Sequence, residues 1–382
     1  MPHLEALARR GTSFRRAYSM PVCSPARFGL IFGEFTGLVS GDACTSPASE
    51  APSPTRFSLP ELMKSAGCST ALFGKWHLGS NPVGPWESSP QVHGFDCWRA
   101  GIPANVKTCG GTSYRKWLRV DDGKSFLSSE YQPTALRSAF LSWWAGTRAP
   151  RFGYVGFQLP HSPMHAPPPE FLPAGFEVGT NSRELYEAML AAADFELGEI
   201  LAAVDLESTW VIVIGDNGTP PEGVPFGKDT GRAKGTTFER GIRVPLVIAG
   251  PGVEKGRETD ALAHAVDLFA TIADVLGAEI PAGAARDSRS LLPVLRGEGR
   301  SAREFVVADV VPDRSDPATR DRAIVAERWK LRRKGVSTEE AYDLLSDPDE
   351  KEPLDASASA MPLEARTALE TLRRELDAYE KR

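Results

Sequence analysis

Apolar and polar positions along the chain predict strands and helices in turn. The run TWVIVIG, residues 209–215, is continuously apolar, which is typical of a buried strand in the middle of a parallel sheet. Apolar residues recur at helical spacing over 182–204, which opens like a capping box at Ser182. Such alternation predicts a doubly wound α/β sheet. The other elements expected before residue 300 are helices over 1–10, 25–33, 58–67 and 264–277, and strands over 12–19, 69–76, 152–158 and 243–252.

The pattern changes after a linker at about residues 281–304. Four short runs then read as antiparallel strands, and a helix follows over 362–380. We therefore expect two units, an α/β domain over 1–300 and a small α+β subdomain over 301–382. The four strands are expected over 304–311, 322–327, 329–335 and 340–348. Residues 42–56 are rich in Pro, Ser and Ala and predict a surface loop, and 79–133 reads as an irregular insertion.

Composition narrows the function without identifying it. The formal net charge is −6 and no block of Lys and Arg stands out, so nothing supports a nucleic-acid or membrane-surface role. No apolar run approaches the roughly 18 residues of a membrane span. The amphipathic N-terminal stretch lacks the apolar region of a signal peptide. The five cysteines form no CxxC pair, and their odd number leaves at least one unpaired, so the compartment stays open.

The stretch PVCSPARFGLIFG, which begins at residue 21, carries the first candidate chemistry. Ser24 is a good helix N-cap and Pro25 a good first helical residue, which would place Cys23 just outside a helix N-terminus. Free backbone N–H groups there favour an anion, and Arg27 can point at the same anion. A nucleophile beside such a cradle suits transfer of a phosphoryl or sulfuryl group. The alternative is a structural cysteine beside a surface arginine.

Four further segments place polar residues at strand ends or in a glycine-flanked loop. Ligand sites in open α/β sheets lie beyond the carboxyl ends of the strands, so these side chains can converge. Each alone has an ordinary structural explanation, such as a solvated strand end or a turn. The residues are Lys75 and His77 in GKWHLG, His161 in LPHSP, Asp216 and Asn217 in GDNG, and Lys234 in RAKGTT. Asp216 and Asn217 offer oxygen ligands that suit a hard divalent cation.

With these motifs the chain resembles the sulfatase family over nearly its whole length. CSPAR matches the family signature C-x-P-x-R, and GKWHLG matches its second signature. DNG, KGTTFERGIRVP and the closing RWKL with AYDLLSDPDE follow in the family's order. C-x-P-x-R alone is a weak signal, whereas five ordered blocks are strong. The resemblance implies an alkaline-phosphatase-like α/β fold with a small C-terminal antiparallel sheet.

The resemblance also implies a chemistry for the signature cysteine. In sulfatases a formylglycine-generating enzyme oxidises it to Cα-formylglycine, whose hydrated aldehyde attacks sulfur and later collapses to release sulfate. By position, Cys23 would be this nucleophile. Arg27 and Lys75 would hold the hydrate, His77 would be the base for collapse, and His161 and Lys234 would contact the sulfate. The implied metal ligands are Asp216, Asn217 and the modified Cys23, around Ca²⁺ or Mg²⁺.

The chain departs from the family pattern in one respect. Sulfatases open with a strand ending in an Asp-Asp pair that supplies two metal ligands, and this strand precedes the helix expected here at 1–10. The pair Asp121–Asp122 stands in the wrong order and is expected to form a hairpin turn. We therefore expect residues 1–382 to bind the cation weakly, turn over slowly and associate or precipitate, and an upstream extension to rescue them.

Three functions remain open on the sequence. The first is a sulfuric-ester hydrolase acting on a small sulfate ester or a sulfated glycan. The second is a phosphodiesterase or phosphonate hydrolase of the same superfamily. The third is a non-catalytic protein that keeps the fold. The natural substrate and the oligomeric state are not predicted by any of these motifs.

Overall fold

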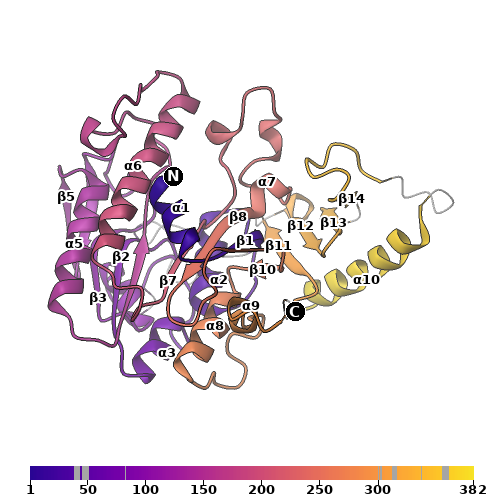
Figure 1. Cartoon of the computed structure of the whole chain (residues 1–382), viewed down its shortest axis with the longest axis horizontal. Coiled ribbons are helices and arrows are strands. Elements are labelled where there is room, and N and C mark those ends of the chain that lie inside the picture. Colours follow the sequence, from indigo (N-terminus) through magenta and orange to yellow (C-terminus); the bar gives the residue numbers. More distant parts are fainter. Residues whose placement is uncertain are drawn as a thin grey trace.

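The computed structural model describes residues 1–37, 44, 51–81, 83–299, 301, 303–311, 316–336, 338–354 and 361–382. Figure 1 shows an α/β body with a smaller lobe that ends in helix α10. Most of the loop expected over 42–56 lies outside the described residues. Within the described part, no helix combines the length and apolar character needed to cross a membrane.

The first sheet has the strand order β10-β1-β8-β7, with β9 also paired to β1. Its strands are β1 (Gly11–Tyr18), β7 (Val211–Ile214), β8 (Arg243–Ala249), β9 (Arg257–Thr259) and β10 (Ala263–His264). Strand β7 pairs with β8 in antiparallel register, and its four residues are only half-buried. The expectation of a central parallel strand over 209–215 was therefore wrong. A continuous apolar run indicates partial shielding on both faces, but it does not encode strand direction.

The second sheet has the order β5-β4-β3-β2-β6. Its strands are β2 (Ser69–Lys75), β3 (Cys97–Ile102), β4 (Trp117–Asp121), β5 (Lys124–Ser128) and β6 (Arg151–Gly156). Strands β2, β3 and β6 are parallel, as the doubly wound prediction requires. Strand β6 in this sheet and β7 in the first each pair on one side only among the described residues.

Residues 79–133 are more regular than the sequence predicted. They contain strands β3, β4 and β5 and two short helices, so the expectation of an irregular insertion was wrong. The strand pattern was missed because some glycine and tryptophan residues here are placed by close packing and not by apolar alternation. Gly101 lies against the Trp98 ring, whose Nε1 donates to Gly74 O at 2.9 Å. The hairpin turn expected at Asp121–Asp122 is confirmed between β4 and β5.

Helices cover both faces of the β2 sheet. Phe73 packs on the face covered by α5 (Gln132–Gly146) and α6 (Ser182–Ala202), which lie side by side in Figure 1. Leu72 points to the opposite face, toward α2 (Cys23–Phe32). The other longer helices are α1 (Pro2–Arg9), α3 (Leu59–Ser65) and α8 (Asp267–Leu276). Helix α6 has the expected capping box, but Asn181 with Glu184 forms it rather than Ser182.

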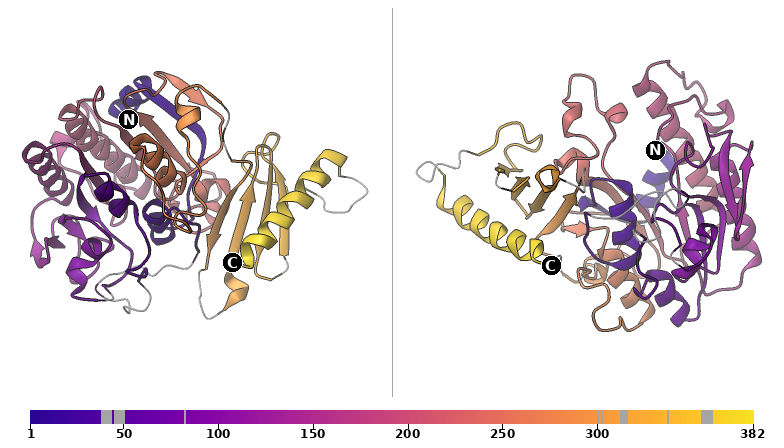
Figure 2. Two further views of the ribbon diagram at one scale, coloured as in Figure 1. Left: turned by 90° about the horizontal axis from the view of Figure 1, so that it is seen from below. Right: turned by 180° about the vertical axis from the view of Figure 1, so that it is seen from behind.

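The C-terminal lobe confirms the expected antiparallel unit. Its sheet has the order β11-β12-β13-β14, and Figure 2 shows α10 lying across one face. The elements are β11 (Val306–Val310), β12 (Asp321–Val325), β13 (Trp329–Lys334), β14 (Thr338–Asp343) and α10 (Leu363–Glu380). Ile324 and Leu331 share an apolar cluster with Met20 and Ala26, so the lobe packs beside the start of α2. The domain division at residue 300 stays a prediction.

Short helices complete the chain between these elements. They are η2 (Trp86–Ser88), α4 (Ser89–Val92), η3 (Pro169–Phe171), η4 (Pro221–Gly223), η5 (Thr230–Arg232), α7 (Glu239–Ile242), α9 (Leu292–Leu295) and η6 (Pro317–Thr319).

Candidate active site

Cys23 is the first residue of helix α2, which begins two residues earlier than the sequence predicted. Val22 is the N-cap and makes no side-chain capping bond, so Ser24 does not cap the helix as expected. The first N–H groups of the helix remain without intrahelical partners, which favours a negative charge at this end. Every residue of α2 is buried, because the helix shares apolar clusters with strands of both sheets and with the C-terminal lobe. Cys23 therefore has a fixed position.

Two predicted site residues flank the Cys23 sulfur directly. Lys234 Nζ donates to Cys23 Sγ at 3.2 Å, and the thiol donates to Asn217 Oδ1 at 3.1 Å. Lys234 lies in a loop that is tied to the cysteine turn, since Gly235 N donates to Pro21 O at 2.9 Å. The loop and the strand end after β7 thus reach the same sulfur from separate parts of the chain.

Arg27 joins the helix to two strand ends. Its Nη1 donates to the carbonyl oxygen of Lys75 at 2.9 Å, and its Nη2 forms an ion pair with Asp216 Oδ2 at 3.0 Å. A side chain at Gly156 would clash with Lys75 O at 2.8 Å and crowd Arg27 Nη1 at 3.1 Å, so a glycine is needed there. The guanidinium is buried, and its fork fixes the relative positions of α2, β2 and the end of β7.

Positive charge exceeds negative charge around Cys23. Burial alone would raise the pKa of Asp216, but Arg27, Lys75 and Lys234 hold it well below its usual range. Burial lowers the pKa of Lys75, with Arg27 and Lys234 acting in the same direction. Three cations thus face one carboxylate in this cluster. A surplus of buried positive charge favours binding of an anion.

Both predicted histidines lie within the field of these cations. His77 is half-buried, with a positive φ of 64°, and desolvation together with the charge of Lys75 lowers its pKa well below the usual value. Burial and the charges of Lys75 and Lys234 lower the pKa of His161 to about 4. Both imidazoles are neutral near pH 7 without a bound anion. A neutral imidazole can accept a proton, and a bound anion would raise the pKa of either one.

The metal ligands expected from the resemblance are only partly matched by the described residues. Asn217 Oδ1 and Asp216 lie beside Cys23, but Asp216 Oδ2 is engaged by Arg27 at 3.0 Å. The described part of the chain has no group of three or more His, Cys, Asp and Glu side chains that could hold a metal ion. One carboxylate and one amide fall short of the six to eight oxygens that Ca²⁺ takes. The donor set does not fit a complete divalent-cation site.

Sequence reasoning missed several residues that hold this cluster in place. Asn105 Oδ1 accepts from Lys75 Nζ at 2.9 Å and from Gln158 Nε2 at 3.3 Å. Tyr114 donates its hydroxyl to His161 O at 2.7 Å, and Ser19 donates to Asp216 O at 2.7 Å. Gln158 stands directly before the LPHSP segment and three residues before His161, and this proximity is a signal in the sequence that could have pointed to it. Asn105 and Tyr114 had no local signal because they lie in the segment read as irregular.

The fold and this cluster define an α/β protein with a buried cysteine at a helix N-terminus and a surplus of cations around it. The chain belongs to the sulfatase family, because the Sulfatase family model matches residues 1–278. A second model, described as N-sulphoglucosamine sulphohydrolase, C-terminal, matches residues 232–377.

Curated relatives agree with this assignment, and a solved structure shares the fold. The chain is 30% identical to N-acetylgalactosamine-6-sulfatase from Sus scrofa over 331 residues, which cover 77% of this chain and 61% of that protein. It is 26% identical to an ulvan-active sulfatase from Formosa agariphila, over 99% of this chain and 75% of that protein. The structure of Ps i-CgsB in complex with a neocarrahexaose matches 99% of this chain and 86% of that chain, with a TM-score of 0.81 and 22% identity.

Proposed function

We propose that this protein is a sulfuric-ester hydrolase that acts on a sulfated sugar. One observation carries the proposal: Cys23 lies at a helix N-terminus in hydrogen-bond contact with Lys234, inside a cluster with more cations than carboxylates. A tetrahedral sulfate ester needs this arrangement, because charge grows on its oxygens and on the leaving oxygen during cleavage. The names of the relatives, an N-acetylgalactosamine-6-sulfatase and an ulvan-active sulfatase, support a sugar sulfate.

Maturation of Cys23 by a formylglycine-generating enzyme is part of the proposal. As formylglycine, Cys23 would supply a hydrated aldehyde whose one hydroxyl attacks sulfur and whose other drives release of sulfate. Lys234 lies 3.2 Å from the sulfur that an oxygen would replace, so its ammonium can stabilise that oxygen. Arg27 and Lys75 supply further positive charge toward the sulfate oxygens.

The two histidines have separate proposed roles. His161 can donate a proton to the leaving alcohol once the bound sulfate raises its pKa from about 4. His77, neutral because burial and Lys75 lower its pKa, can accept the proton released as the hydrate collapses. Proton transfer of this kind contributes about 10²–10⁴-fold to a rate.

Binding of Ca²⁺ or Mg²⁺ by Asp216, Asn217 and the modified Cys23 stays a proposal. Because these donors fall short of a complete coordination shell, no proton or charge transfer above depends on the cation. We expect residues 1–382 to bind Ca²⁺ weakly, and calorimetric titration with CaCl₂ measures this. Tight binding would reveal a ligand outside this donor set.

Co-expression with a formylglycine-generating enzyme tests the proposed function. Mass analysis of the peptide that contains Cys23 should show the aldehyde, and the purified protein should release sulfate from 4-nitrophenyl sulfate and from N-acetylgalactosamine 6-sulfate. Cys23→Ala is the matched control and should be inactive. A thiol in every preparation and no sulfate release would overturn the proposal. Faster cleavage of bis(4-nitrophenyl) phosphate than of either sulfate would favour the phosphodiesterase alternative.

A further inference from the structure

Lys75 is a buried cation whose direction is set by a residue from another part of the chain. It ends strand β2, is 2% exposed, and donates from Nζ to Asn105 Oδ1 at 2.9 Å. An ammonium has three donors and a flexible four-carbon stem, so a fixed acceptor determines where the charge lies. A hydrogen bond to a charged group of this kind is stronger than one between neutral groups.

The same Asn105 oxygen joins Lys75 to the segment that carries His161. Gln158 Nε2 donates to Asn105 Oδ1 at 3.3 Å, and His161 N donates to Gln158 O at 2.8 Å. Asn105 and Gln158 are thus a bridge between the ends of β2 and β6. A shift of the Asn105 side chain would move Lys75 relative to His161.

The Asn105 loop, residues 102–111, is built to keep that oxygen in place. It runs beside the end of β2, where Trp76 N donates to Ile102 O at 3.0 Å and His77 N donates to Pro103 O at 2.9 Å. A tight turn follows, in which Asn105 N donates to Thr108 Oγ1 at 3.2 Å and Thr108 N donates to Asn105 O at 3.0 Å. The loop thereby contacts the backbone of His77, beside Lys75.

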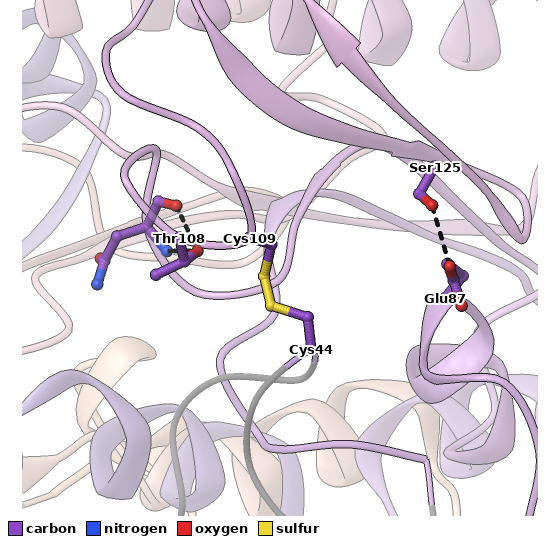
Figure 3. Close-up of a disulfide and its surroundings, with 6 residues drawn as sticks. Cys44, Glu87, Thr108, Cys109 and Ser125 are labelled. Carbon is purple, nitrogen blue, oxygen red and sulfur yellow. Dashed lines mark hydrogen bonds between the residues drawn. A yellow bond between two sulfur atoms is a disulfide. The ribbon is translucent and has the colours of Figure 1, made fainter.

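A disulfide bond links the Asn105 loop to a distant part of the sequence. Cys109 directly follows Thr108 in the turn and is bonded to Cys44, with the two Cα atoms 6.2 Å apart (Figure 3). That separation lies within the usual range for disulfides. The bond spans 65 residues of sequence and links the Asn105 loop to the segment after α2. The three other cysteines, Cys23, Cys68 and Cys97, are free and buried.

We infer that Asn105 is a positioning residue for Lys75, and that the Cys44–Cys109 disulfide fixes the loop that presents it. This inference rests on the proposed function, because Lys75 matters here only as a binder of the sulfate group. Its consequence is that the sulfate site depends on the redox state of a disulfide that contributes no atom to it.

Asn105→Leu tests the first part, since leucine has a similar size and no acceptor. We expect kcat for 4-nitrophenyl sulfate to fall about 10–100-fold, the loss of one hydrogen bond to a charged group, and inorganic sulfate to bind more weakly by calorimetry. In a Lys75→Met background the same substitution should have little further effect. Full additivity of the two substitutions, or an unchanged kcat and sulfate affinity in Asn105→Leu, would overturn the inference.

Reduction of the unmutated protein tests the second part and does not depend on the folding of a variant. Dithiothreitol should lower kcat several-fold once alkylation and mass analysis show free thiols at Cys44 and Cys109. The double variant Cys44→Ser/Cys109→Ser should have the same lowered kcat and no further response, which controls for a reaction of the reagent with formylglycine. Full activity with both thiols free would overturn this part. A wild-type protein that neither binds sulfate nor hydrolyses a sulfate ester would instead overturn the proposed function itself.

Discussion

Two buried charged clusters in this chain differ in their balance of charge. Around Cys23, Arg27, Lys75 and Lys234 face the single carboxylate of Asp216. Between α7 and the C-terminal sheet, Lys330 is fully buried and meets two carboxylates, Glu239 Oε1 at 3.1 Å and Glu350 Oε1 at 2.7 Å.

We call the cluster around Lys330 the matched cluster, because its cations are paired with carboxylates, and the one around Cys23 the unmatched cluster. The pairing in the matched cluster extends to neighbouring residues. Arg332 forms an ion pair with Asp321 at 3.0 Å and another with Glu340, and Tyr18 donates to Glu239 Oε2 at 3.1 Å. Every buried cation there has a carboxylate partner in the chain, so the cluster is complete without a ligand. The cluster around Cys23 lacks such internal compensation, which supports the proposed binding of an anion there. Buried charge alone therefore does not identify a site, whereas buried charge without internal compensation does.

The largest effect expected from this contrast is on turnover. Lys234→Met, Lys75→Met and His161→Ala in the matured, active protein should each lower kcat about 10²–10³-fold. Thermal stability should change little, and the two lysine variants, which each remove one of three like charges, should even be slightly more stable. Sulfate-ester kinetics and thermal melts on the same preparations measure both quantities. Near-normal turnover in any one variant would remove that residue from the proposed site.

The matched cluster should respond in the opposite way. Lys330→Met leaves the carboxylates of Glu239 and Glu350 buried without their cation, and we expect a loss of about 3–5 kcal/mol in the free energy of unfolding. The kcat of the protein that remains folded should be close to normal. Urea unfolding measures the loss. The triple variant with Glu239→Gln and Glu350→Gln should recover part of it, and a stable Lys330→Met protein would contradict the structural role.

The charged and nucleophilic residues around Cys23 were easier to predict from the sequence than the residues that hold them in place. Cys23 and Arg27 share one helical turn, and His161, Asp216 and Lys234 each stand in a short motif, so local patterns were enough to select them. Asn105 lies 30 residues from Lys75 and has no motif of its own. A hydrogen-bond partner of that kind depends on how β3 places the loop after it, which no local pattern encodes.

The strands were likewise predicted where the local sequence was sufficient and missed where the pairing depends on distant residues. Three of the four C-terminal strands were predicted to within two residues because antiparallel neighbours follow one another along the chain, as with β12 and β13. The fourth was expected over 340–348 and is β14 (Thr338–Asp343), so its end was wrong. The direction of β7 was not predicted correctly, because its partner β8 lies beyond the loop that carries Lys234 and an apolar run fits either direction. The strands within 79–133 escaped prediction because Gly101 interrupts β3 and most of β5 is exposed, so neither shows a clear apolar pattern.

A buried imidazole outside both clusters should make the free energy of unfolding depend on pH. His93 stacks on Trp76 and is buried away from any cation, and burial alone lowers its pKa to about 4 from a usual 6.5. The unfolded chain therefore binds a proton at His93 between pH 6.5 and 4 that the folded chain does not. The free energy of unfolding should fall across that window as the pH falls, by up to about 3 kcal/mol from this residue. Urea unfolding of the wild-type protein and of His93→Asn from pH 7 to 4 measures the slope, which should be flatter in the variant.

The smallest effect, and the most direct comparison of the two clusters, is the response to inorganic sulfate. An anion that binds only the folded protein stabilises it by RT ln(1 + [L]/Kd), about 1.4 kcal/mol at ten times Kd. The unmatched cluster around Cys23 should produce this gain in the wild-type protein and lose most of it in Lys234→Met. Lys330→Met, although less stable, should keep it, because its cluster has no surplus positive charge to offer an anion. Thermal melts in sodium sulfate, against sodium chloride of equal ionic strength, separate binding from screening. An equal gain in Lys234→Met and the wild type would place the anion elsewhere, and would leave the charge surplus around Cys23 without a function.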